Sequence, residues 1–219
     1  MRAWLAALLL AAAPAWAAPF AVPVGDTRIG LEAPAGFADT EFTGSPRLQE
    51  IAESLTSASN RVLLFAISDG DLRNFMQGDQ PELRRFMVAV TPRALEDQSV
   101  TTGQFDAFVG DALRGLGSPA PHGKMLKYLD AQPLGKTVLL GDLRRDTTVV
   151  SVLQGTRVPN PEGRDAKPQY LLSTTSLLNL RGKALSVSVY SSYESPDDLD
   201  WIKLVTARWI ADLERLNAR

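Results

Sequence analysis

Residues that could carry acid–base or nucleophilic chemistry are sparse in this 219-residue chain. His122 is its single histidine, and cysteine is absent. One imidazole can act as a general base, but serine catalysis of the hydrolase type uses a Gly-x-Ser-x-Gly elbow, and no such motif occurs. Without cysteine there is no thiol nucleophile, iron–sulfur cluster or covalent c-type haem, and a lone histidine leaves only carboxylates as further zinc ligands. The sequence therefore predicts no catalytic residue, no metal site and no cofactor.

Two acidic clusters have simpler explanations than metal binding. Asp69-Gly70-Asp71 resembles part of a calcium loop, but the other acids of an EF-hand and its glutamate at the twelfth position are missing. A turn in which Ser68 or Asp69 caps the following helix explains the same residues. Asp197 and Asp198 lie where the last predicted helix begins, and carboxylates at that position complement the helix dipole.

Two features leave room for binding a partner or a ligand. The first is a predicted strand whose non-core side carries small hydroxyls and tyrosines, a combination that can line a ligand groove. Its residues are Ser186, Ser188, Tyr190, Ser192 and Tyr193, with Ser173, Thr174, Thr175 and Ser176 on the neighbouring strand. The second is the pair Arg144 and Arg145, expected in a turn where it could meet an anionic partner. An ordinary solvated sheet face and exposed loop arginines are the alternatives.

The element that must position the hydroxyl-bearing strand is the C-terminal segment from residue 180 onward. Apolar and polar residues alternate over 185–190, the period of a strand with one buried face. Ser195 and Pro196 then supply an N-cap and a proline at the first helical position. Leucine, isoleucine, valine and Trp209 recur beyond them at three- and four-residue spacing. This predicts a capped amphipathic helix that buries Trp209 against a sheet.

The rest of the chain predicts a mixed fold without strict strand–helix alternation. Apolar patterning favours strands over 28–33, 61–67, 86–90, 135–141, 147–153, 170–178 and 184–193. Helices are expected over 47–55, 72–76 and 103–116 and from 196 to the C-terminus, and residues 142–146 are expected to connect a hairpin. The last four strands follow one another as hairpins. We therefore expect an α+β fold in which an antiparallel sheet is flanked by helices.

The N-terminus is typical of a secretory signal peptide. Arg2 precedes an apolar run that ends at Pro14, and Ala15 and Ala17 are the small residues that precede a cleavage site. The run is shorter than the roughly 20 residues of a membrane span. Cleavage after Ala17 would leave one α+β domain, residues 18–219, with no stable membrane insertion. We expect a periplasmic or secreted bacterial protein.

Three segments resemble the Mog1/PsbP-like fold group. The first strand ends at Pro34-Ala35-Gly36-Phe37, the strand 86–90 leads to a helix capped by Thr101 or Thr102, and the strand that starts after Gly182 leads to the tryptophan-bearing C-terminal helix. The resemblance covers most of the mature chain and implies an αβα sandwich. It also implies an adaptor or accessory subunit rather than a catalyst, and it carries over no functional residue.

The charge composition restricts the class of partner that the protein can bind. The chain holds 23 basic and 25 acidic side chains, a balance that argues against binding nucleic acid, because phosphate binding needs a concentrated basic surface. We expect a non-enzymatic accessory or adaptor that binds another periplasmic or envelope protein. The alternatives are a histidine-independent hydrolase and a small-ligand carrier that uses the hydroxyl-rich sheet face. A hydrolase requires a deep pocket with convergent ionisable groups, a carrier a largely apolar cavity, and an adaptor an exposed patch or groove.

Overall fold

A computed structural model of the chain describes residues 18–121, 123–160 and 168–218. The expected signal peptide, residues 1–17, and His122 lie outside the described residues. Within the described ranges no helix is long and apolar enough to cross a lipid bilayer.

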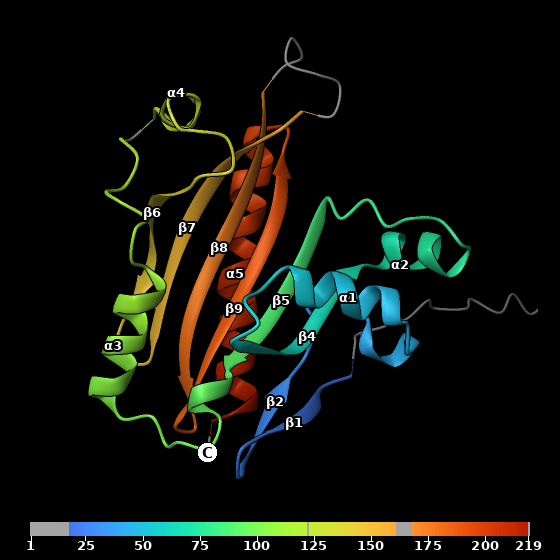
Figure 1. The fold of residues 1–219 in the computed structure, drawn as a ribbon, viewed down its shortest axis with the longest axis vertical. Helices are drawn as coiled ribbons and strands as arrows, with labels where there is room; N and C mark the ends of the chain where they lie inside the picture. The colour runs from blue at the N-terminus through green and yellow to red at the C-terminus, as the bar shows by residue number, and fades with distance from the viewer. Residues whose placement is uncertain (1–17, 122, 161–167, 219) are drawn as a thin grey trace, which may run out of the picture.

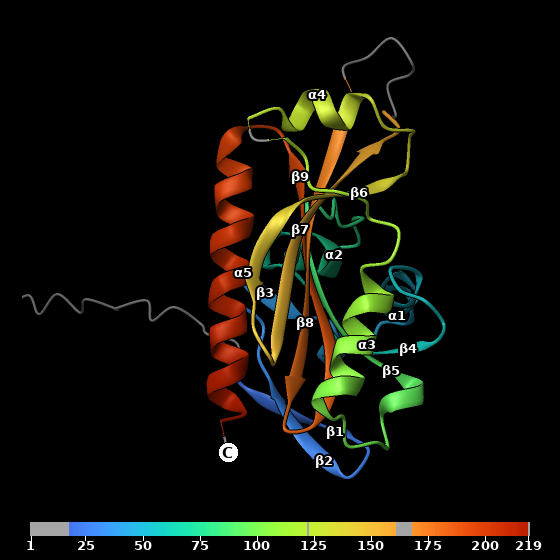
Figure 2. The ribbon, with the colours of Figure 1, turned by 90° about the vertical axis from the view of Figure 1, so that its left-hand side faces the viewer.

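The centre of the molecule is a seven-stranded antiparallel sheet in the order β3-β4-β5-β9-β8-β7-β6. Helices cover both of its faces (Figures 1 and 2), which confirms the expected α+β fold with an αβα arrangement. The strands are β3 (Phe37–Asp39), β4 (Asn60–Ser68), β5 (Arg85–Pro92), β6 (Thr137–Arg145), β7 (Val149–Val158), β8 (Gln169–Leu180) and β9 (Lys183–Tyr193).

Helix α5 (Pro196–Leu216) lies along one face of the sheet, where it packs mainly on β8 and β9 (Figure 2). Ser195 and Asp198 close a capping box at its start, with Pro196 in the first turn. Trp209 is 1% exposed in the core between the helix and the sheet, and its Nε1–H donates to the Glu32 carbonyl at 2.9 Å. The predicted cap, amphipathic helix and buried tryptophan are therefore confirmed.

Shorter helices cover the opposite face in two separate places (Figure 1). Helices α1 (Pro46–Ser54) and α2 (Asp69–Met76) lie over β4 and β5, where Leu48 and Ala52 of α1 are buried. Helix α3 (Thr102–Ala112) lies over the other half of the sheet and buries Phe105 and Val109. The short α4 (Met125–Asp130) lies at one end of the sheet, and the 3-10 turns η1 (Glu41–Thr43) and η2 (Arg93–Leu95) follow β3 and β5.

Several local predictions differ from the structure. Strands β1 (Phe20–Val24) and β2 (Thr27–Leu31) form a separate hairpin, although only the second was expected as a strand. Residues 142–145 belong to β6 rather than to a connection, because two bulges let this strand follow β7 to Arg145. The turn is Asp146–Thr148, where Asp146 Oδ1 accepts the Thr148 and Val149 N–H groups. Strand β3 and helix α4 were not expected.

Candidate functional site

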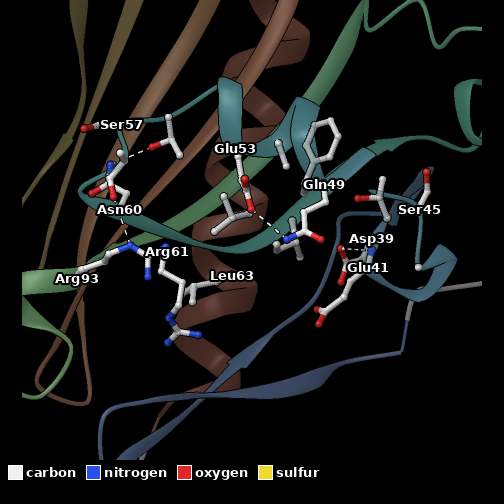
Figure 3. A pocket seen from close by; sticks show the side chains of 18 residues that line it. Asp39, Glu41, Ser45, Gln49, Glu53, Ser57, Asn60, Arg61, Leu63 and Arg93 are labelled. Atoms are coloured by element: carbon white, nitrogen blue, oxygen red, sulfur yellow. Dashed lines mark hydrogen bonds between the residues drawn. The ribbon is translucent and has the colours of Figure 1, made fainter. Parts of the chain in front are cut away.

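The candidate site is a groove along the outer edge of β4, which we call the edge groove. Its volume is about 690 Å³. It is bounded by Asp39 at the end of β3 and the segment 40–45 that follows, by α1 and the turn after it, by residues 60–65 of β4, and by Arg93 (Figure 3). The groove exists because the strand next to β4 ends early and leaves part of the β4 edge unpaired.

Pairing stops early because β3 is short. Strand β4 has nine residues, but β3 pairs only with Ala66–Ser68. The Thr40 N–H then donates to the Phe65 carbonyl at 2.8 Å, and the chain turns away into η1. Residues 60–64 of β4 therefore have β5 on one side and the edge groove on the other.

The pairing register shows which backbone groups face the groove. Asn60 pairs with Pro92, and because proline has no N–H this position is a non-hydrogen-bonded pair. By alternation, Val62 and Val90 also form a non-hydrogen-bonded pair, so the N–H and C=O of Val62 point away from β5. The Asn60 N–H donates to the Ser57 carbonyl at 2.9 Å. Val62 is therefore where the edge offers the groove both a donor and an acceptor.

A β-bulge closes this stretch. The register between β4 and β5 shifts between Val62 and Leu64, and the extra residue, Leu63, is buried in the core on the α5 side. A bulge bends and twists its strand and so limits pairing along an edge. The strand edge that can accept a further strand is thereby confined to a short segment centred on Val62.

Helix α1 forms the upper wall of the groove. Ser45 caps its first turn by accepting the Leu48 N–H. Because Leu48 and Ala52 pack on the sheet, the exposed residues Gln49 and Glu53 are turned along the groove (Figure 3). They are one helical turn apart, and Gln49 Nε2 donates to Glu53 Oε1 at 3.0 Å.

One end of the edge groove is acidic. Asp39 and Glu41 lie there, next to the end of β3 (Figure 3). Burial raises the pKa of Asp39, and the hydrogen bond that its Oδ1 accepts from the Glu41 N–H opposes this only in part. None of the ion pairs within the described residues involves Asp39 or Glu41.

The other end of the edge groove is basic. Arg61 is held by Glu96 at 3.1 Å and by the Pro23 carbonyl at 2.7 Å. Arg93 is exposed and uses its Nε to bond the Ala58 carbonyl at 3.3 Å. In the part of the chain that the structure describes, Arg93 has no ion-pair partner. The edge groove thus presents an uncompensated negative charge at one end and an uncompensated positive charge at the other.

This arrangement suits binding of a chain segment better than catalysis. The lining contains one carboxyl whose pKa is raised, Asp39, and no histidine, whereas acid–base catalysis needs at least two tuned groups in one place. Among the described residues no group of three or more His, Asp or Glu side chains is placed to hold a metal ion. An open groove with charged ends and a bare strand edge has the features of a β-strand addition site.

A second hollow of about 480 Å³ lies between α2, the start of β5 and the start of α5. Its charges are largely compensated within the chain. Arg85 Nη2 bonds Asp198 Oδ1 at 2.7 Å, and its guanidinium lies 4.0 Å from the centre of the Trp201 ring. Arg84 pairs with Glu194. The edge groove is the stronger candidate because Glu41 and Arg93, at its two ends, have no ion-pair partner among the described residues.

The predicted hydroxyl-rich face exists, but it does not reach the edge groove. Ser186, Ser188, Tyr190 and Ser192 alternate with buried residues on β9, as expected, and their side is the part of the sheet that lies between α3 and α1 (Figure 1). On the neighbouring strand β8, Ser173 and Thr175 share this face, and both donate to Gln154 Oε1 at 3.3 Å.

Other members of the predicted surface face the opposite way. Tyr193 is one residue out of phase and packs against the core on the α5 side, with its ring 6.3 Å from that of Tyr170. Thr174 likewise faces α5, where its hydroxyl bonds that of Thr206 at 2.7 Å. Tyr190 stacks on Phe86 at 4.5 Å, and burial raises its pKa. The predicted residues therefore do not form a single surface.

Arg144 and Arg145 lie near the end of β6, not in the turn where they were expected. Arg144 makes a bidentate bond to Glu214 of α5 at 2.8 Å and another to Asp146 at 2.7 Å. These bonds raise the pKa of Arg144 and tie β6 to the end of α5. Arg145 is more exposed and lies 3.6 Å from Asp142. Neither arginine is near the edge groove, since β6 and β4 lie on opposite sides of the sheet centre.

Comparisons with known proteins do not assign the chain to a family. No protein-family model and no curated protein sequence matches the chain. Among solved structures, the chain is similar to the Ran-binding protein Mog1p of Saccharomyces cerevisiae, with 13% sequence identity over 93% of this chain and 94% of that one, and a TM-score of 0.38. At this identity and TM-score the similarity carries no argument about fold family, partner or site.

Proposed function

We propose that the chain is a non-enzymatic accessory or adaptor protein that acts in the bacterial periplasm or outside the cell by binding another envelope protein. The observation that carries the proposal is the edge groove, a bare strand edge between walls of the same chain. The charged n-region, apolar run and small residues before position 18 support export. They also support cleavage after Ala17 to leave a single domain of residues 18–219.

A comparison of the two edges of the sheet supports a binding role for the edge groove, because one edge is hydrogen-bonded to another segment of the chain and the other is open. At the β6 edge, the segment after α3 pairs with the strand: the Ala120 N–H donates to the Leu139 carbonyl at 3.1 Å, and the Leu139 N–H donates to the Leu116 carbonyl at 3.2 Å. At the β4 edge, no strand among the described residues continues beyond Asp39. Bare edges favour unwanted association, and proteins generally cover them. One covered edge and one open edge in the same sheet favour a binding role for the open one.

Site-specific photocrosslinking in the producing cell tests the proposal. Benzoylphenylalanine replaces Gln49 in the groove wall, or Lys203 on the exposed side of α5 as the matched control. We expect one or a few discrete protein adducts from position 49, in the exported fraction, and none of these from position 203. If position 49 yields no adduct beyond those of position 203, the groove is not a protein-binding site. Mass measurement of the exported chain checks whether it begins at Ala18.

A further inference from the structure

The charge polarity of the edge groove and the direction of β3 together define the kind of segment it would hold. This inference rests on the proposed function, because it describes the partner of the same site. Strand β3 runs antiparallel to β4, and a further strand on this edge would continue its line past Leu64 toward Asn60. Five residues, 60–64, span about 17 Å at 3.4 Å per residue. The incoming segment would therefore begin beside Asp39 and Glu41 and end beside Arg93.

We propose that the partner is recognised through an extended segment of about five residues that adds to β4 in the antiparallel direction. Its backbone bonds the N–H and C=O of Val62. A basic side chain at its N-terminal end faces Asp39 and Glu41, and an acidic side chain at its C-terminal end faces Arg93. The backbone pair supplies attachment, and the two charged ends set direction, because complementary charges fix register more than they add affinity.

The Asp39 carboxyl supports the assignment of a cation to this end. It is partly buried, and none of the ion pairs among the described residues involves it; burial and the neighbouring Glu41 carboxylate raise its pKa. A lysine or arginine of an incoming segment would supply the missing positive charge. Glu41 is exposed beside it and adds to the negative potential.

A second copy of this chain fits the edge less well than an isolated segment. The groove is walled by α1 and by residues 39–45, which belong to the same chain as the edge (Figure 3). A copy that met the edge about a two-fold axis would bring its own α1 to the same face of the sheet, beside the α1 already there. A short segment without attached helices meets no such obstacle.

The test is NMR titration of the 15N-labelled domain 18–219 at low salt with three capped six-residue peptides. The first is Lys-Val-Thr-Val-Thr-Glu, the second exchanges its terminal Lys and Glu, and the third is the first with its two central amides N-methylated. We expect shifts centred on residues 60–64, roughly fivefold tighter binding of the first peptide than of the second, as two exposed ion pairs would give, and loss of binding for the third.

Two variants separate the charge effect from folding. Glu41→Gln should reduce the preference for the first peptide, while Glu50→Gln, exposed on α1 but outside the groove, should leave it unchanged. Equal affinity for the first two peptides, binding of the N-methylated peptide, or shifts centred elsewhere would each overturn the inference. So would a Val62 amide shift that depends on protein concentration without peptide, because it would assign the edge to a second copy.

The peptide and crosslinking experiments fail independently. If position 49 gives specific adducts but the peptides show no polarity or no dependence on their amides, the groove binds a protein in another manner and only the present inference falls. If the peptides bind as expected but position 49 gives no adducts in cells, the groove binds extended segments in vitro, but the proposed adaptor function is wrong.

Discussion

Replacing Trp209 with alanine should be among the most damaging single changes in the domain. The indole is 1% exposed at the centre of the core beneath α5, and its Nε1–H donates to the Glu32 carbonyl at 2.9 Å. Truncation of a buried tryptophan to alanine costs about 3–5 kcal/mol. For a domain of about 200 residues, 1 kcal/mol shifts the melting temperature by about 2–4 °C. We therefore expect a fall of about 6–20 °C.

Two further variants assign the loss to its causes. Trp209→Phe keeps most of the apolar contact but leaves the Glu32 carbonyl without its donor, so an intermediate loss of about 1–3 kcal/mol is expected. Leu204→Ala, at a position 50% exposed on the same helix, should cost less than about 1 kcal/mol. Urea unfolding followed by circular dichroism measures all three, with unchanged m-values as the condition for comparing them. If Trp209→Ala moves the midpoint no further than Leu204→Ala, α5 does not pack on the sheet as described.

Two other changes test the pH dependence of stability and the approach of the β1–β2 turn. Burial opposes ionisation of Asp198, yet the Glu194 N–H and Arg85 lower its pKa overall, so its stabilisation is full above the ordinary aspartate pKa of about 3.9 and is lost as pH falls through the lowered folded value. Asp198→Asn should therefore be less stable at neutral pH and lose less stability on acidification, and urea midpoints across acidic pH would contradict this if both proteins declined in parallel. Gly25→Ala should cost about 1–3 kcal/mol, because φ is +57° and a Cβ would lie 2.3 Å from the Glu96 carbonyl oxygen; Gly36→Ala, at φ +85° with no neighbouring atom within 4 Å, should lower the melting temperature less.

The parts of the fold that could be predicted are those whose causes are local. The cap at Ser195 and the apolar spacing around Trp209 specify α5 within its own sequence. The β8–β9 hairpin is similarly local, since Arg181 and Gly182 adopt φ values of 54° and 77° in a two-residue turn that such values favour. Alternation on β9 also predicted which side of the strand carries Ser186 and Ser188. It would have placed Tyr193 on the opposite side had it been applied strictly.

The edge groove could not be predicted in the same way because its causes are non-local. A strand over 61–67 was expected, but nothing in that run indicates that its outer neighbour would pair with three residues and stop. No strand or helix was expected between residues 34 and 46, and nothing in that stretch indicated that it would form a wall of the groove. Pro92 is the one sequence feature that bears on the edge, since it fixes the hydrogen-bonding phase of the pair with Asn60. That information has meaning only after the pairing is known.

The features of the β4 edge indicate that its exposure is selective and is not simply the result of a missing strand. The bulge at Leu63 and the free charges of Glu41 and Arg93 are devices that discourage indiscriminate edge-to-edge pairing. They leave Val62 able to bond a strand, but only one that fits between α1 and residues 39–45 and tolerates a negative end and a positive end. An edge with no partner would be protected more simply by a longer β3, because the chain already lies in line at Thr40. Selective exposure of one short, charged edge segment is what a docking site for an extended segment requires.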